Sequence, residues 1–305
     1  MIGWIILGIV VAFLAVLLIR AATFNPKKNN IPQPQPISFD QEAAINALQT
    51  LEQCKTISYN EKALEDDAEF QKLIDSLPGL YPAVFKACSF TQLPDRALLF
   101  RWPGKAPGDP AVMMAHYDVV PVDEEKWDKP AFSGLIEDGV MWGRGTLDTK
   151  ATFNGVLSAA NNLIAQGFTP EHDVYFAFSG GEEVNGQGAV NIVDWFLKQG
   201  IEPAMVVDEG GAVVENVFPG VKEPCGLIGI AEKGMMNVQY TVRSRGGHAS
   251  APPTKTPLTT LAKACQNIIK HPFKMHLTKP AAEMFDTLGR RSSFALKLVF
   301  ANLWL

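Results

Sequence analysis

The chain has 305 residues, 47% of them hydrophobic and 19% charged, which is enough for a large core in one or two domains. The formal net charge of −5 offers no basic field, so a nucleic-acid partner is excluded. The four cysteines are widely spaced with no CxxC pair, which argues against a cysteine-ligated metal and against a disulfide framework.

The chain begins with an uninterrupted apolar run over residues 2–19, which is long enough to span a bilayer. No basic segment precedes it, and "RAATF" after it is a poor match to a signal-peptide cleavage site. We therefore interpret residues 1–22 as an uncleaved single-pass membrane anchor, with a cleaved signal peptide as the alternative. Arg20, Lys27 and Lys28 favour a cytoplasmic globular part, but other signals can override this rule, so the side of the membrane stays open.

Residues 23–37 are rich in proline and asparagine and read as a semi-extended linker. Ser38 with Gln41 then predicts a capping box at the start of a helix, and a second, acidic helix is expected over residues 61–77. From residue 111 onward, short apolar runs alternate with amphipathic segments, which is typical of an α/β sheet. The predicted strands are 111–115, 174–179, 204–207 and 226–230, and the predicted helices are 149–166 and 189–199.

Polar side chains follow three of these predicted strands. His116 and Asp118 follow the first, Glu182 and Glu183 the second, and Asp208 the third. Functional groups of open α/β sheets gather at the carboxyl ends of the strands. We therefore expect these side chains to form one site.

Each residue also has an ordinary interpretation. The histidine–aspartate pair can be a surface turn, and the two glutamates can lie in a solvated loop. Asp148, in "MWGRGTLDTK", can be a helix N-cap, and Asp208 can simply end its strand. If every one of these ordinary interpretations were correct, each of the polar residues would follow a strand or precede a helix only by chance. We therefore favour a metal centre.

One imidazole with several carboxylates and no cysteine suits Zn²⁺, Co²⁺ or Mn²⁺. Two such ions require a bridging carboxylate, and the water that they activate needs a free carboxylate as general base. This explains the adjacent charges in "FSGGEEVNG", which would otherwise repel each other: one glutamate binds metal and its neighbour acts as the base.

Five segments carry a resemblance to a known family: "AHYDVVPV", "WDKPAFSGLIEDGVMWGRGTLDTK", "FSGGEEVNGQGA", "VVDEGGAV" and "RGGHASAPP". In their order and spacing they resemble the dinuclear zinc exopeptidases that include glutamate carboxypeptidase, aminoacylase and succinyl-diaminopimelate desuccinylase. The likeness covers about residue 40 to the end. "ANLWL" and the tethered start are most similar to the Gly-X carboxypeptidase and N-acyl-amino-acid hydrolase branch.

The resemblance implies a role for each metal-centre residue. His116 and Asp208 would bind one zinc ion and Glu183 the other, Asp148 would bridge both, and Asp118 would hold His116 in place.

It also implies the catalytic groups and the partners. Glu182 would be the general base and then the proton donor, and His248 would support the oxyanion. In dimeric members this histidine can come from the partner subunit, so a homodimer through the lid domain is consistent with the resemblance. The implied reaction is hydrolysis of an amide bond in a small peptide or N-acyl amino acid by a metal-activated hydroxide.

The implied fold is an α/β zinc-exopeptidase-like mixed sheet flanked by helices, with an inserted α+β lid. Residues 38–234 would form the catalytic part and 235–305 an incomplete lid, beginning with a strand and loop over 235–250. Gly181 stands where the family usually has aspartate, a change of little expected consequence. The chain also stops at Leu305, before the family's last zinc-binding histidine, so we expect a fragment.

Two other functions fit part of this sequence. The first is a catalytically inactive, membrane-tethered remnant that binds one metal weakly or partners a complete homologue. The second is a dinuclear phosphoesterase, which predicts neither a lid nor a "GGHAS" segment and is therefore disfavoured.

Overall fold

The computed structural model describes residues 1–27, 33, 36–216, 218, 220–231, 234, 236–248, 250–251 and 253–305. The chain forms two compact units, which are treated separately below. One comprises Gln33–Glu209, and the other comprises Met1–Pro32 with Gly210–Leu305.

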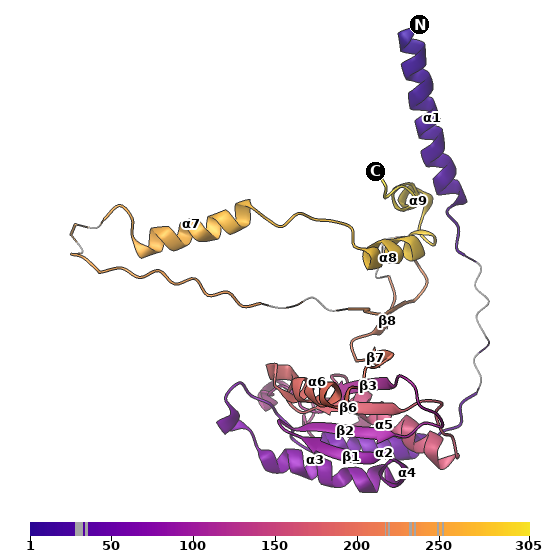
Figure 1. Cartoon of the computed structure of the whole chain (residues 1–305), viewed down its shortest axis with the longest axis vertical. Coiled ribbons are helices and arrows are strands. Elements are labelled where there is room, and N and C mark those ends of the chain that lie inside the picture. The colour runs from indigo at the N-terminus through magenta and orange to yellow at the C-terminus, as the bar shows by residue number, and fades with distance from the viewer. Residues whose placement is uncertain are drawn as a thin grey trace. The chain divides into compact units, whose positions relative to one another are not determined.

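A five-stranded sheet organises the Gln33–Glu209 unit (Figure 1). Its strands are β1 (Ser89–Leu93), β2 (Ala97–Trp102), β3 (Ala111–His116), β6 (Val174–Ser179) and β7 (Met205–Val207). In the order β1-β2-β6-β3-β7, the first two pairings are antiparallel and the last two are parallel. This confirms the predicted mixed α/β sheet, and it brings the carboxyl ends of β3, β6 and β7 to one edge.

Helices cover both faces of this sheet. Four pack on one face, namely α2 (Gln41–Glu52), α3 (Asp67–Leu80), α4 (Pro82–Ala87) and α5 (Lys150–Ala165), whereas α6 (Gly188–Gln199) packs on the other. The larger core joins Leu51, Phe153 and Phe178, all fully buried, and the smaller core joins Tyr175 to Phe196. With helices on both faces, the central strands are buried on each side, which accounts for their nearly continuous apolar sequence.

Short elements complete the unit. They are the 3-10 turns η1 (Lys62–Leu64), η2 (Glu124–Lys126) and η3 (Glu182–Val184), and the two-stranded sheet of β4 (Leu135–Glu137) and β5 (Val140–Trp142). The turn η3 directly follows β6, so the strand end passes straight into the glutamate pair.

The start of α2 corrects one prediction. Its N-cap is Asp40, whose carboxylate accepts a hydrogen bond from the Ala43 amide, and not Ser38. The Ser38 carbonyl instead accepts bonds from the side chains of Asn162 and Gln166 on α5. An aspartate caps at least as well as a serine, and Asp40 is the one that directly precedes the first helical turn.

The other unit contains the predicted anchor. Its elements are α1 (Ile2–Thr23), β8 (Ala212–Val214), β9 (Cys225–Leu227), α7 (Pro257–Lys270), α8 (Lys279–Gly289) and α9 (Phe294–Phe300). The helix α1 is long and apolar enough to cross a membrane, and a signal sequence near the N-terminus would pass the same test. Near its end, the Arg20 guanidinium donates to the Ala301 carbonyl just after α9, at 3.0 and 2.8 Å.

Two expected strands turn out differently. The predicted strand 226–230 appears as β9, which pairs antiparallel with β8 and does not belong to the five-stranded sheet. The strand expected within 235–250 is not formed by its described residues, 236–248 and 250. Most of those residues are exposed, and a strand without a pairing partner is not stable.

Candidate metal centre

His116 is the residue around which the site is built. It ends β3, where it pairs with Ser179 of β6, and it is 1% exposed. Its Nδ1 lies 2.9 Å from the Asp118 carbonyl oxygen and 3.4 Å from the Asp118 Oδ1. Nδ1 is thus in contact with Asp118, two residues after the strand residue His116, and Nε2 remains to face the site.

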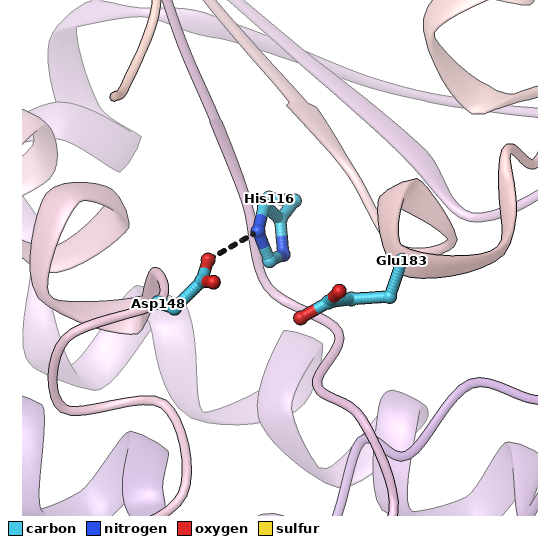
Figure 2. Close-up of side chains that lie close together, drawn as sticks. All are labelled: His116, Asp148 and Glu183. Atoms are coloured by element: carbon cyan, nitrogen blue, oxygen red, sulfur yellow. Dashed lines mark hydrogen bonds and ion pairs between the residues drawn. The ribbon is translucent and has the colours of Figure 1, made fainter. Parts of the chain in front are cut away.

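The second ring nitrogen, Nε2, faces carboxylates. It lies 3.1 Å from Asp148 Oδ1, 3.2 Å from Glu209 Oε1 and 3.8 Å from Glu182 Oε2. Figure 2 shows Asp148 and Glu183 on either side of the imidazole. We call His116, Asp148, Glu182, Glu183 and Glu209 the candidate metal centre.

Two overlapping sets of ligand atoms occur in this centre. His116, Asp148 and Glu183 form one set, and His116, Glu182 and Glu209 form the other, with all atoms of a set within 4.8 Å of one another. Each set offers one imidazole nitrogen and two carboxylate oxygens, which are ligands suited to Zn²⁺ and similar divalent ions.

The fold accounts for this convergence. β3 runs parallel to both β6 and β7, so the residues after these strands meet at one edge of the sheet. His116 comes from the end of β3, the glutamate pair from η3 and Glu209 from the segment after β7. Asp148 arrives from the loop that leads into α5, a helix packed beneath the same sheet.

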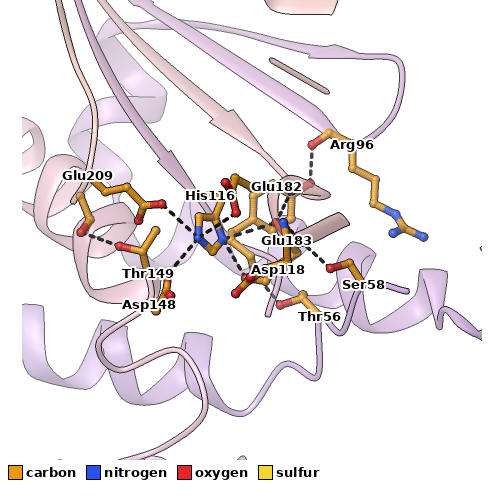
Figure 3. A network of polar contacts seen from close by, with 12 residues as sticks. Thr56, Ser58, Arg96, His116, Asp118, Asp148, Thr149, Glu182, Glu183 and Glu209 are labelled. Carbon is orange, nitrogen blue, oxygen red and sulfur yellow. Dashed lines mark hydrogen bonds and ion pairs between the residues drawn. The ribbon is translucent and has the colours of Figure 1, made fainter. Parts of the chain in front are cut away.

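Asp118 connects the parts of this centre. It is 0% exposed, and its carboxylate accepts hydrogen bonds from the backbone amides of Glu182, at 3.0 Å, and Glu183, at 3.2 Å. The Ser58 hydroxyl donates a further bond to the Asp118 Oδ2, at 2.7 Å. Figure 3 shows Asp118 between the imidazole and the turn that carries the glutamates.

The electrostatics of the centre favour a cation. Burial lowers the pKa of His116, but the hydrogen bond with Asp118 and the charges of Asp118 and Glu209 raise it to about 10 overall. Burial, together with the neighbouring acids, raises the pKa of Glu182 and of Glu183. A divalent ion would relieve the repulsion among these carboxylates with His116 neutral, so the residues present fit a metal.

Asp118 itself stays ionised. Burial raises its pKa, but hydrogen bonds from His116 and Ser58, the charge of His116 and the Glu182 amide lower it overall. A permanent negative charge behind the ring suits a residue that orients a metal-binding imidazole.

The predicted residues do not all gather here. Asp208 is exposed, and its Oδ1 accepts a hydrogen bond from the Glu209 amide at 2.9 Å. Glu209 lies beside His116 in the position expected for Asp208, so the assignment of Asp208 as a ligand stays a prediction. His248 lies in the other unit, where it is exposed with its Nδ1 2.8 Å from the Ser250 hydroxyl, and its catalytic role also stays a prediction.

The sequence-based prediction missed several contributors. Glu209 directly follows Asp208 in "VVDEGG", and adjacency to a candidate ligand was its only signal. Ser58 lies far from the other site residues in sequence, and nothing in its local pattern indicates a contact with Asp118.

Two ionisable side chains, Lys150 and Glu52, are fully buried next to the loop that carries Asp148. Lys150, 0% exposed, donates to the carbonyls of Leu51 and Cys54 at the end of α2. Glu52, also 0% exposed, has no hydrogen-bond partner for either carboxylate oxygen. Burial raises the pKa of Glu52 to about 7 and lowers that of Lys150 to about 8.

Two glycines let this loop pass directly over Glu52. A Cβ atom added at Gly143 would lie 2.6 Å from Glu52 Oε2, and one at Gly145 would lie 3.0 Å from Glu52 Oε1. Gly145 also has a φ of +123°, which side-chain-bearing residues rarely adopt. The loop therefore requires glycine at both positions.

One family model and several curated proteins match this chain. The family model described as Peptidase family M20/M25/M40 matches residues 112–299. "Probable carboxypeptidase S-like 2" of Dictyostelium discoideum is 32% identical over 99% of this chain and 60% of its own length. "N-fatty-acyl-amino acid synthase/hydrolase PM20D1" of Xenopus tropicalis is 32% identical over 98% of this chain and 60% of its own length.

Among solved structures, human carnosine dipeptidase 1 matches with a TM-score of 0.47 and 15% identity, over 57% of this chain and 40% of the other. The chain spans about three fifths of the length of the two curated relatives above.

Proposed function

The chain belongs to the peptidase family M20/M25/M40, and we propose that its site hydrolyses an amide bond in small peptides or N-acyl amino acids. The observation that carries the proposal is the convergence on His116 of carboxylates from three separate segments. The relatives are called a probable carboxypeptidase and an N-fatty-acyl-amino acid synthase/hydrolase, and both names refer to an amide bond formed by the amino group of an amino acid.

In this proposal the centre holds two zinc ions, with cobalt or manganese as substitutes. His116, Asp148 and Glu183 would hold the ions, Asp148 as a ligand of both, and the pair Asp208–Glu209 would supply a further carboxylate. When bound, the ions supply an activated water and neutralise charge that develops on the substrate.

The residues of the chain divide the remaining work. Glu182 takes the proton of the attacking water and returns it to the leaving amine, for which its exposed carboxylate, 3.8 Å from His116 Nε2, is suited. Asp118 keeps the imidazole of His116 aimed at the centre. His248 is assigned to the oxyanion of the intermediate, where a donor lowers the barrier.

The proposal extends to the surroundings of the enzyme. We assign α1 as a single-pass membrane anchor on the basis of its length and apolar sequence. Residues 235–305 are assigned to a lid domain through which two copies can pair, and 38–234 to the catalytic part.

The test uses the purified 305-residue chain in detergent, stripped of metal and then titrated with zinc. We expect zinc to bind at the candidate metal centre with fewer than two ions per chain, and any hydrolysis of dipeptides or N-acyl amino acids to depend on that zinc. Zinc binding without hydrolysis would favour the inactive, tethered metal-binding protein. Failure to bind zinc, cobalt or manganese would refute the proposal.

A further inference from the structure

The segment that follows α2 lies along the residues after β3. The Val119 amide donates to the Thr56 carbonyl at 2.9 Å, and the Ser58 amide donates to the Val119 carbonyl at 3.1 Å. Ile57 forms a parallel bridge with Val119, and the Thr56 hydroxyl donates to the Tyr117 carbonyl. None of these contacts involves the Ser58 hydroxyl, so the segment is held in place without it.

That hydroxyl is directed at Asp118. Ser58 is 1% exposed, and its Oγ lies 2.7 Å from Asp118 Oδ2. A hydroxyl that donates to an ionised carboxylate forms one of the stronger hydrogen bonds found in proteins. Because water is excluded here, the lost bond would have no ready replacement.

The orientation of the Asp118 carboxylate affects both the imidazole of His116 and the turn that carries Glu182 and Glu183. The Asp118 Oδ1 accepts from the Glu182 amide and lies 3.4 Å from His116 Nδ1, whereas Oδ2 accepts from the Glu183 amide. Rotation about the Asp118 Cβ–Cγ bond would disturb all three contacts. The Ser58 hydroxyl opposes that rotation, because it donates to Oδ2, the oxygen that also accepts from the Glu183 amide.

We propose that Ser58 is a positioning residue of the metal centre: through Asp118 it sets the orientation of both His116 and the Glu182–Glu183 turn. This inference rests on the proposed function for its metal. The Ser58–Asp118 contact and the two amide bonds are properties of the chain alone, so part of the test needs no metal.

The first measurement is zinc affinity of the metal-free full chain, by competition with a chelator. Ser58→Ala should weaken zinc binding by about tenfold, the lower end of what loss of an outer partner of a metal ligand costs. The control is Thr56→Val, which removes a buried hydroxyl of the same segment that bonds to Tyr117 and not to Asp118. It should lower the melting temperature and leave zinc affinity unchanged.

The second measurement is amide hydrogen exchange in the metal-free chain. Ser58→Ala should speed exchange at Glu182 and Glu183 severalfold, and Thr56→Val should not. Ser58→Cys leaves no cavity, although its side chain is slightly larger, and it weakens the donor, so it should shift affinity and exchange in the same direction even if the alanine variant does not fold.

The outcomes separate this inference from the proposed function. Tight zinc binding by the wild type with equal affinity in all variants would overturn the role of Ser58 and leave the function standing. Absence of zinc binding in the wild type would refute the function, and the exchange rates would then decide the role of Ser58. Equal changes in zinc affinity and in amide exchange for Ser58→Ala and Thr56→Val would mean that both residues only stabilise the segment.

Discussion

Glu209 Oε1 lies 3.2 Å from His116 Nε2, whereas the carboxylate of Asp208, one residue earlier, accepts a bond from the Glu209 amide. Two acids therefore follow β7 at the metal centre, and only one of them faces the imidazole. Of the two, Glu209 is the one within hydrogen-bond distance of His116, so Glu209 is the better candidate for a ligand of an ion there.

Substitutions at these two positions distinguish them. Glu209→Gln should weaken zinc binding by tenfold or more, because it removes the carboxylate beside His116, and Asp208→Asn should have a smaller effect. Isothermal titration of metal-free protein measures both. The reverse order would assign the ligand to Asp208, as the sequence pattern indicates.

Replacement of Glu182 should separate chemistry from metal binding. Glu182→Ala should reduce turnover by at least about a hundredfold, since a general base contributes that much or more. Zinc content, measured by atomic emission on the same sample, should stay close to that of the wild type. If zinc is lost together with activity, Glu182 is a ligand and the two glutamates have exchanged roles.

Replacement of Asp148 should affect both ions. Because Asp148 is the proposed bridging ligand, Asp148→Ala should leave less than one tightly bound zinc ion per chain. Asp123→Ala, at an exposed aspartate in the loop after β3, serves as control and should retain full zinc content. Two ions per chain in the Asp148 variant would disprove the bridging role.

The buried Glu52 should make stability depend on pH. Its pKa is raised to about 7 in the folded chain, so between about pH 5 and 7 the folded state binds more protons than the unfolded state. The free energy of unfolding should therefore fall as pH rises through this window, by on the order of 3 kcal/mol. The lowered pKa of Lys150, about 8, acts only above this range.

Thermal melts at pH 5 and pH 7 test this effect. Glu52→Gln should lose less stability than the wild type between the two values, because the glutamine does not ionise. Glu42→Gln, at an exposed position of the same helix, should follow the wild type. Parallel curves for wild type and Glu52→Gln would show that the Glu52 carboxylate is solvated in solution.

Removal of the apolar helix tests the anchor. A variant lacking residues 2–19 retains Arg20, which bonds to Ala301, and should move from the membrane fraction to the soluble fraction. Recovery of the intact chain in the soluble fraction, at full length, would argue against an anchor.

The pattern of apolar residues predicts most of the sheet. β3 and β6 are buried strands with continuous apolar sequences, and α5 has strict helical periodicity, so all three were expected within a residue or two of their bounds. The hairpin β1–β2 was missed because its strands are mixed: β1 is mostly exposed and β2 contains Arg101, which pairs with Asp173. Its one local signal is the Pro94–Asp95 turn.

Some residues of the site could also be predicted from the sequence, and others could not. Residues that end strands, such as His116 and Glu183, could be assigned because the topology of a parallel sheet brings strand ends together. Ser58 could not, because its contact with Asp118 depends on how the segment after α2 packs against β3, and that is a tertiary property. The choice between Asp208 and Glu209 depends on a single backbone rotation, which residue types alone do not specify.

Asp118, Asp148, Glu182 and Glu209, the acids within 4 Å of His116, all precede Gly210, where the second unit resumes. Protein synthesis runs from the amino terminus, and domains tend to fold as they emerge from the ribosome. A nascent polypeptide can therefore assemble the candidate metal centre while the ribosome is still translating the codons for the later residues.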